Sequence, residues 1–236
     1  MGNHSWLSVQ TVRKKTTLSV LLLELVAGVG GMSITAKGCI QISVKNALLN
    51  VRRKKMPWND PEIQKVMLNH IVKNYKPATI AILDVGPGIG TFGKHLHPHF
   101  YIDCIEIFEL YLYKYKLYEK YNNIMWGNIK DFTKYERYNL VIVGDVFEHM
   151  TEEDARTALD NMKKGVDEIV ISLPYESQQG EECGNPYEIH IQDYLTPEII
   201  SELYPELTQI YENKAIGRKG LAVYNWKKEV ECKEKE

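Results

Sequence analysis

Residues 80–93 read Ile-Ala-Ile-Leu-Asp-Val-Gly-Pro-Gly-Ile-Gly-Thr-Phe-Gly, and this stretch decides the fold that the sequence predicts. It begins with an apolar run containing β-branched residues, which is typical of a parallel strand covered on both faces. Asp84 stands near the end of that run, and three alternating glycines follow it. Glycine tolerates positive φ angles and has no Cβ to keep a ligand away from the backbone. The stretch therefore predicts a strand, a tight ligand-binding loop and a helix beginning near Thr91, whose N-terminus offers unpaired N–H groups.

The composition is that of a soluble globular protein. The chain has 236 residues, enough for one sizeable α/β domain and an extension. Its net charge of −2 gives no global electrostatic reason to bind nucleic acid or anionic membranes. The four cysteines are scattered without a CxxC pair, which indicates free thiols in a reducing compartment. We therefore expect a cytoplasmic protein that does not associate with membranes.

Three regions differ in composition. Residues 1–55 are an N-terminal extension whose structure the sequence does not define, 56–228 form the main domain, and 229–236 are a charged tail. Within the extension, an apolar run follows basic residues as in a secretory signal. Glu24 interrupts this run, which is too short to span a membrane. A packed helix or strand, or a leader, is therefore favoured over a signal peptide.

Apolar runs alternate with helical patterns along the main domain. Asp60-Pro61-Glu62 and Thr196-Pro197-Glu198 each combine an N-cap acceptor, a proline and an acid, and so predict helix starts. The last two expected strands have no helix between them and should pair antiparallel. The pattern predicts an α/β fold with a doubly wound, mostly parallel seven-stranded sheet and a C-terminal antiparallel hairpin. Strands are expected at 80–85, 101–107, 124–126, 138–144, 168–173, 207–211 and 221–226. Helices are expected from 61, from 91, at 108–121, from 151 and from 197, and Thr151 is the expected N-cap of the helix that begins there.

Two motifs compete for the glycine loop. Gly88 to Gly93 matches GxGxxG, the dinucleotide fingerprint, which expects an acid about 20 residues further on. Glu106 lies nearer than that. The other interpretation takes Asp84, two residues before the three glycines, as part of the motif. This unit resembles motif I of the class I S-adenosylmethionine-dependent methyltransferases.

Other segments extend that resemblance over residues 60–226. Glu106 matches the acid that binds the ribose at the end of the second strand in this family. Asn128 stands where the family usually has an Asp near the adenine amino group, and an amide can still accept that hydrogen bond without charge. Asp145-Val-Phe-Glu-His resembles the segment that lies against the methionine end of the cofactor, and the closing hairpin also belongs to the family. The resemblance implies a methyltransferase domain at 56–228, S-adenosylmethionine as cofactor, and cofactor-binding roles for Asp84, Gly86, Pro87, Gly88, Gly90, Glu106, Ile107, Asn128, Ile129, Asp145 and Val146.

The acceptor side of the site is expected in the loops after the fourth and fifth strands, as in this family. That placement nominates Glu148, His149, Glu188 and His190 as catalytic candidates. Histidine titrates near neutral pH, so His149 and His190 are the better candidates for a general base. A metal site formed by Asp145, Glu148, His149 and His190 is an alternative, but the prediction includes no metal.

The remaining histidines of the domain have simpler interpretations. His70 lies on the apolar face of the first expected helix and should be a packed or hydrogen-bonded core residue. His95, His97 and His99 alternate and could bind a metal from one side of a strand, but Pro98 favours a loop.

The class of acceptor is narrowed by motifs that the sequence lacks. The segment after the fourth strand has no Asn/Asp-Pro-Pro-Tyr signature, no Pro-Cys pair is present, and no RNA-binding module is recognisable. We expect O- or N-methylation (EC 2.1.1.-) of a small molecule or glycan by a compact enzyme resembling those of bacteria and their phages. The alternatives are a nucleic-acid or protein methyltransferase that uses the basic run 52–55 and Trp58, or a non-catalytic cofactor-binding module. A homodimer is left open, and a nicotinamide oxidoreductase is disfavoured.

Overall fold

The computed structural model describes residues 60–213 and 220–229. Several expectations fall outside these residues: the structure of the extension 1–55, a short strand that the alternation of Ile40, Ile42 and Val44 indicates within it, the basic run 52–55, and Trp58. The connection between the last two strands and most of the charged tail also lie outside them. The main domain can therefore be compared with the sequence prediction from Asp60 onward.

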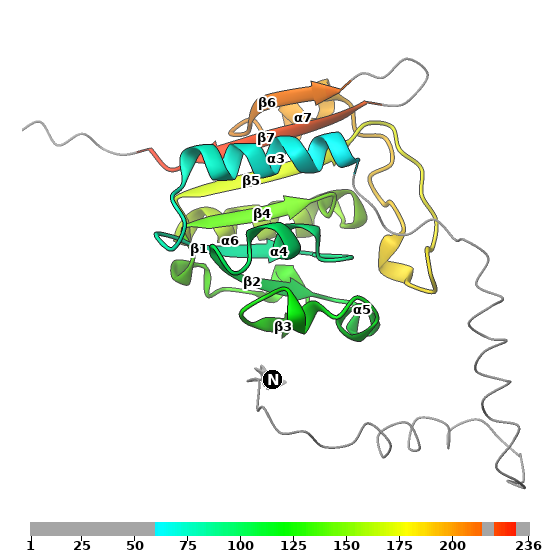
Figure 1. Ribbon diagram of the computed structural model, residues 1–236. Coiled ribbons are helices and arrows are strands. Elements are labelled where there is room, and N and C mark those ends of the chain that lie inside the picture. The colour runs from blue at the N-terminus through cyan, green and yellow to red at the C-terminus, as the bar shows by residue number, and fades with distance from the viewer. Residues whose placement is uncertain (1–59, 214–219, 230–236) are drawn as a thin grey trace, which may run out of the picture. The chain divides into compact units, whose positions relative to one another are not determined.

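A single seven-stranded sheet organises the domain (Figure 1). Its strand order is β3-β2-β1-β4-β5-β7-β6. The five strands from β3 to β5 pair in parallel, whereas β7 pairs antiparallel with both β5 and β6. This confirms the predicted doubly wound sheet with an antiparallel C-terminal hairpin. The strands are β1 (Ala81–Val85), β2 (Tyr101–Glu106), β3 (Ile124–Trp126), β4 (Leu140–Gly144), β5 (Glu168–Pro174), β6 (Thr208–Asn213) and β7 (Leu221–Lys227).

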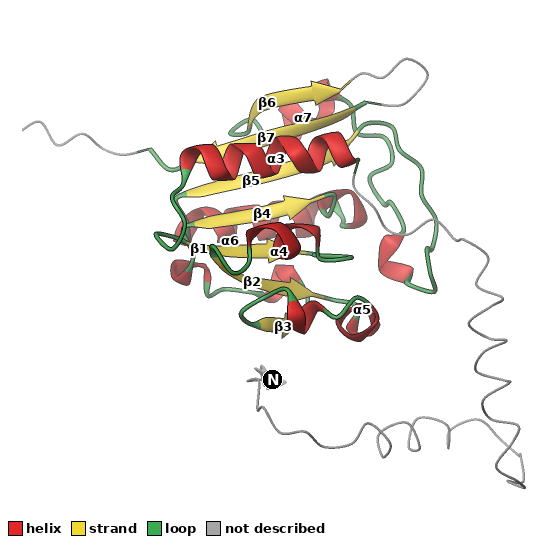
Figure 2. Ribbon diagram, viewed as in Figure 1, coloured by secondary structure: helices red, strands yellow, loops and turns green. Residues whose placement is uncertain are grey.

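Helices cover both faces of the sheet (Figure 2). On one face lie α3 (Pro61–Asn74) and α4 (Thr91–Leu96), and on the other lie α6 (Glu152–Gly165) and α7 (Pro197–Leu203). The predicted N-caps of the three longer helices are in place, because Asp60, Thr151 and Thr196 accept hydrogen bonds from backbone N–H groups of the first turn.

The two faces carry separate apolar cores, because neighbouring residues of a strand point to opposite sides. In β1, Ile82 packs with Met67 of α3 and Phe92 of α4, whereas Leu83 packs in the cluster that contains Leu159 of α6. Asp84 has the same parity as Ile82 and is therefore directed to the face of α3 and α4.

The predicted continuous helix at 108–121 is wrong in its extent. The structure has α5 (Glu109–Lys114) followed by the 3-10 helix η1 (Leu117–Glu119). Lys116 separates them with a φ of 50°, in the left-handed region, which ends an α-helix. The change of direction buries Leu117 and Tyr121 in the core under α4. Tertiary packing has therefore overridden the helical spacing of the aromatic residues.

A polar cluster joins α3 to the amino end of β5. Glu168 is 1% exposed and accepts hydrogen bonds from His70 (Nε2 to Oε1, 2.7 Å), Tyr75 (Oη to Oε2, 2.5 Å) and Asn225 (3.1 Å). Burial alone would raise the pKa of Glu168, but these hydrogen bonds outweigh it and lower the pKa to about 2. His70 is therefore the hydrogen-bonded core histidine that the sequence predicts.

No helix in residues 60–213 and 220–229 combines the length and apolar character needed to cross a bilayer.

Candidate functional site

The glycine loop after β1 is shaped by close approach to the segment after β4. Gly86 has a φ of +61° and donates its N–H to the carbonyl of Ile105 at 2.9 Å. A Cβ built on Gly86 would lie 2.7 Å from Cγ2 of Val146, nearer than side chains approach one another. Gly86 and Val146, which are both predicted to bind the cofactor, are therefore packed against each other.

The next glycine of the loop faces open space. Gly88 has a φ of +50°, and a Cβ built on it would have no atom within 4 Å. The loop then closes through a hydrogen bond from Gly90 N–H to the carbonyl of Pro87 at 2.7 Å. At Gly88 the backbone is therefore open to a ligand from outside.

Asp84, near the end of β1, is linked to the start of α4 through the hydroxyl of Tyr121. It is 1% exposed, and the hydroxyl of Tyr121 donates to its Oδ2 at 2.5 Å. The same hydroxyl accepts from the N–H of Gly93 in α4 at 3.2 Å. Burial raises the pKa of Asp84 to about 7, although the hydrogen bond from Tyr121 lowers it. Asp84 therefore connects strand, loop and helix through Tyr121, a residue that the sequence analysis does not nominate.

Glu106 ends β2, the neighbour of β1, and is the second acid at this edge of the sheet. It is 4% exposed, and its Oε1 accepts from the N–H of Phe108 at 2.8 Å. Burial, with a smaller effect from the nearby charge of Glu188, raises its pKa to about 7 against the lowering effect of the hydrogen bond from Phe108. The next residue, Ile107, is fixed by a hydrogen bond from Trp126 Nε1 to its carbonyl at 3.0 Å. A carboxylate is thus held at the carboxyl end of β2, where this fold class places its ligands.

Asn128 and Ile129 follow β3. The side-chain oxygen of Asn128 accepts from the N–H of Lys130 at 3.1 Å and so caps the 3-10 helix η2 (Ile129–Asp131). Ile129 is buried in the core on the α6 face. The side-chain oxygen of Asn128 has two lone pairs. It can therefore accept a hydrogen bond from a ligand in addition to the one from Lys130.

Asp145 follows β4 in a left-handed backbone conformation, with a φ of 53°. Its Oδ1 accepts from the hydroxyl of Ser172 at 2.5 Å, and its N–H donates to the same hydroxyl at 3.1 Å. Burial raises the pKa of Asp145 to about 6, against the lowering effect of Ser172. Ser172 is the second residue that the sequence analysis misses. Its signal is a hydroxyl in the otherwise apolar run of β5.

Glu148, His149 and His190 are brought together, although His190 lies in the loop after β5. Their ligand atoms all lie within 4.8 Å of one another. The two imidazole rings meet edge to face with centroids 4.7 Å apart. Burial lowers the pKa of both histidines, that of His149 to about 4. Glu148 is 1% exposed, and neither of its carboxylate oxygens has a hydrogen-bond partner among the described residues.

Gln192 fastens the loop after β5 to the 3-10 helix η4 (Phe147–His149). Its side-chain Nε2 donates to the carbonyls of Phe147 at 2.8 Å and Met150 at 3.0 Å. The backbone N–H groups of Ile191 and Gln192 both donate to the carbonyl of Glu148. Gln192 is 2% exposed and is the third residue that the sequence analysis misses, because its contacts link segments far apart in the chain.

Glu188, the fourth catalytic candidate, is not part of this cluster. It lies on the 3-10 helix η5 (Pro186–Glu188), where Asn185 Nδ2 donates to its Oε1 at 3.2 Å. Gln179 donates to its carbonyl at 3.0 Å. Its charge raises the pKa of both Glu106 and Glu148, so Glu188 lies within electrostatic reach of the ribose-binding candidate and of the acceptor side.

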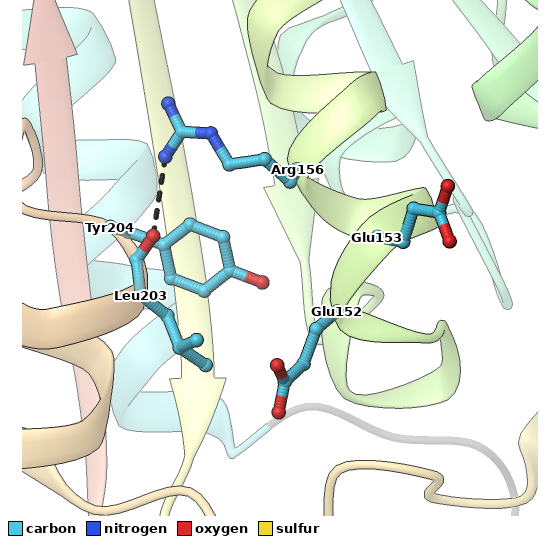
Figure 3. Close-up of a pocket in the computed structure, with 5 residues that line it drawn as sticks. All are labelled: Glu152, Glu153, Arg156, Leu203 and Tyr204. Carbon is cyan, nitrogen blue, oxygen red and sulfur yellow. Dashed lines mark hydrogen bonds between the residues drawn. The ribbon is translucent and has the colours of Figure 1, made fainter.

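A separate pocket of about 330 Å³ lies between α6 and α7 (Figure 3). Glu152, Glu153, Arg156, Leu203 and Tyr204 line it, and none of these is a predicted site residue. Arg156 donates to the carbonyl of Leu203 at 3.2 Å, as the figure shows, and also pairs with Asp160 and Glu206. This pocket is therefore bordered by the ion pair between Arg156 of α6 and Glu206, which lies just after α7.

Solved structures with the same fold, all at low sequence identity, include methyltransferases. N-methyltransferase NodS from Bradyrhizobium japonicum WM9 is 19% identical, with a TM-score of 0.51 over 71% of this chain and 96% of that one. The N-terminal domain of EvdMO1, crystallised in the presence of S-adenosylhomocysteine and D-fucose, is 12% identical, with a TM-score of 0.54 over 80% and 97%. Magnesium protoporphyrin IX methyltransferase ChlM from Synechocystis PCC 6803, solved with bound S-adenosylmethionine, is 10% identical, with a TM-score of 0.50 over 82% and 86%.

No protein-family model matches the chain, and no curated protein matches it. The similarity to known proteins therefore rests on the fold alone. The chain has the fold of the class I S-adenosylmethionine-dependent methyltransferases.

Proposed function

We propose that this protein transfers a methyl group from S-adenosylmethionine to a small-molecule or sugar acceptor. One observation carries the proposal. The glycine loop, open at Gly88, follows β1, the buried Glu106 ends β2, and the half-buried Asp145 follows β4; these three strands are adjacent, so the three features meet at the carboxyl edge of the sheet. This is where a doubly wound fold binds a nucleoside ligand.

Each part of the cofactor has a partner of fitting chemistry. The open backbone at Gly88 admits the ligand against the loop without a Cβ in its way. Glu106 would accept hydrogen bonds from the ribose hydroxyls, and a charged acceptor makes such bonds strong. Asn128 and Ile129 would border the adenine. Asp145 and Val146 would lie against the methionine part, next to the acceptor side of the site.

The chemistry is a displacement at the methyl carbon. The bond from the sulfonium sulfur to the methyl carbon breaks as the acceptor oxygen or nitrogen forms its bond, and the cofactor leaves as a neutral thioether. The protein contributes mainly by aligning donor and acceptor. The acceptor loses a proton when it is a hydroxyl or an ammonium. Glu148, His149, His190 and Glu188 border that side and are the residues we assign to the acceptor.

The neighbouring structures support a small acceptor. NodS is an N-methyltransferase, ChlM acts on magnesium protoporphyrin IX, and the EvdMO1 domain was crystallised with D-fucose present. A sugar or another compact polar molecule is therefore the first class to test.

Turnover is tested by incubating the full chain with S-adenosylmethionine and a panel of sugars, amino sugars and small hydroxylated or amino compounds. Formation of S-adenosylhomocysteine that depends on one acceptor class is the expected result. Glu106→Gln should lower turnover at subsaturating cofactor, and Glu109→Gln, which changes an exposed acid nearby, should not. Cofactor binding without turnover on any acceptor would identify a non-catalytic binding module instead.

A further inference from the structure

We propose that Glu148, His149 and His190 bind a divalent transition-metal ion on the acceptor side of the site. The three side chains offer one carboxylate oxygen and two imidazole nitrogens, all within 4.8 Å of one another. Atoms bound to one such ion lie about 3–4 Å apart, because each bond is about 2.0–2.2 Å long. The ligand atoms therefore need to move together by no more than about 1–2 Å to bind a common ion.

The hydrogen bonds of the two histidines orient their free nitrogens. Nδ1 of His149 lies 3.2 Å from the carbonyl of Ile189, and Nδ1 of His190 lies 2.6 Å from the carbonyl of Ser177. A carbonyl oxygen can only accept, so Nδ1 of each ring carries the proton and Nε2 carries the lone pair. A backbone carbonyl on the distal nitrogen is the support that metal-binding histidines usually have.

Glu148 is the independent observation that points to a ligand. Its side chain is 1% exposed, and neither carboxylate oxygen has a hydrogen-bond partner in residues 60–213 and 220–229. A buried carboxylate without a partner is costly, and buried charges in proteins are paired or coordinate metals. A bound cation would supply the missing partner at the point where both imidazole nitrogens are available.

The backbone around the cluster is fixed before any ion binds. The carbonyl of Glu148 accepts from the N–H groups of Ile191 at 2.8 Å and Gln192 at 3.0 Å. Gln192 also bonds the carbonyls of Phe147 and Met150. Two ligands from η4 and one from the loop after β5 are therefore held by contacts that do not involve the ligand atoms.

The donor set selects the kind of ion. Two imidazoles and one carboxylate suit zinc, cobalt, iron or manganese, whereas magnesium and calcium prefer oxygen ligands. Asp145, which the sequence alternative included, is engaged by Ser172 and is not in the cluster. Three protein ligands leave coordination positions open, as in catalytic zinc sites. The inference revises the expectation of a site without metal.

The experiment measures metal binding without cofactor or acceptor, so its outcome is independent of the proposed methyl transfer. Cobalt(II) is titrated into the metal-stripped full chain while its visible absorption and the melting temperature are followed. We expect one ion per chain, an absorption band of nitrogen and oxygen ligation, and a rise in melting temperature. His149→Ala, His190→Ala and Glu148→Gln should each weaken binding at least about tenfold.

Control variants distinguish binding at these three residues from nonspecific metal binding and from effects of misfolding. His95→Ala and His99→Ala remove exposed histidines elsewhere and should leave binding unchanged. Glu148→Gln keeps the shape of the side chain and replaces the buried carboxyl with an amide, so the metal-free variant should melt close to the wild-type chain while losing the rise on adding cobalt. Absence of binding to the wild-type chain, or equal binding to the triad variants and the controls, would overturn the proposal. Tighter binding of magnesium than of cobalt would overturn it as well.

Discussion

Glu106 is buried and is also the residue expected to bind the ribose of the cofactor. The affinity for the cofactor should therefore depend on whether Glu106 is ionised. Its pKa is raised to about 7, chiefly by burial, so it is largely protonated below that pH. Only the ionised carboxylate offers charged acceptors to both ribose hydroxyls. Affinity for the cofactor should therefore fall as pH decreases through about 7, approaching a tenfold loss for each pH unit below it.

Isothermal titration calorimetry between about pH 6 and about pH 8 measures this dependence. Glu106→Gln should bind about 10- to 100-fold more weakly at the higher pH and show a flatter profile. An unchanged pH profile in that variant would assign the ionisation to another group.

The glycine loop offers a matched pair of substitutions. Gly86→Ala places a Cβ 2.7 Å from Val146 in a left-handed conformation, whereas Gly88→Ala adds a Cβ in the same kind of conformation with no atom within 4 Å. Both should cost about 1–2 kcal/mol of unfolding free energy for the backbone, and Gly86→Ala should cost more because of the contact.

Gly86→Ala should mainly lower the stability of the fold, whereas Gly88→Ala should mainly lower the affinity for the cofactor. Urea unfolding should find Gly86→Ala the less stable, and calorimetry should find that Gly88→Ala loses cofactor affinity out of proportion to its stability. Equal stability of the two variants with full cofactor binding by Gly88→Ala would contradict the assigned role of the open backbone.

At the scale of elements, α3 is held to the sheet by Glu168. The pKa of this carboxyl is lowered to about 2, so its contribution to stability is present above its ordinary value of 4.5 and is lost as pH falls towards 2. His70→Ala removes the 2.7 Å hydrogen bond and should lower the free energy of unfolding by about 1.5–3 kcal/mol near neutral pH. Chemical denaturation should show this loss shrinking in acid, and His95→Ala, an exposed change, should show no loss.

The loop after β5 should depend on Gln192. Gln192→Ala leaves the carbonyls of Phe147 and Met150 without the donors seen here. Hydrogen exchange should then speed up at the backbone N–H groups of 190–192 and leave β1 and β4 protected. Uniform deprotection of the whole domain would mean that the residue supports the core and does not specifically fasten the loop.

Local patterns in the sequence predict the elements well and the contacts between them poorly. The caps at Asp60, Thr151 and Thr196 fixed three helix starts, since their signals lie within a few residues of each other. The expected helix at 108–121 was too long, because the break at Lys116 is set by packing of the residues after it.

In the candidate site, too, the residues with a local sequence signal could be predicted, and the residues that support them from distant segments could not. Asp84, Glu106 and the glycine loop are adjacent to strand ends and could be nominated from the chain alone. Tyr121 and Gln192 support the site from distant segments, and only the folded sheet brings them to Asp84 and Glu148. Ser172 had a weak local signal as a hydroxyl within an apolar strand.

For the whole molecule, the acids at the carboxyl edge should make the ligand-free protein more stable in mild acid. The pKa values of Asp84 and Glu106 are both raised by burial to about 7. Between their ordinary values and about 7 the folded state binds more protons than the unfolded state, so stability falls as pH rises through this range. Differential scanning calorimetry should give a higher melting temperature near pH 6 than near pH 8, and Glu106→Gln should reduce the difference.

In stronger acid the stability should instead fall as pH decreases, because Glu168 becomes protonated and its contribution to stability is lost. A melting temperature that rises steadily from pH 6 to pH 8 in the ligand-free chain would contradict the burial of these acids as ionisable groups.

If the loop after β1 and Glu106 form a site for S-adenosylmethionine, the full chain should also bind the reaction product S-adenosylhomocysteine, and calorimetric titration measures that binding. One cofactor should bind per chain, with affinity weakened by Glu106→Gln and by Gly88→Ala and unaffected by Glu109→Gln. No heat of binding at millimolar S-adenosylhomocysteine, or binding that Glu106→Gln and Gly88→Ala leave unchanged, would contradict this assignment of the site.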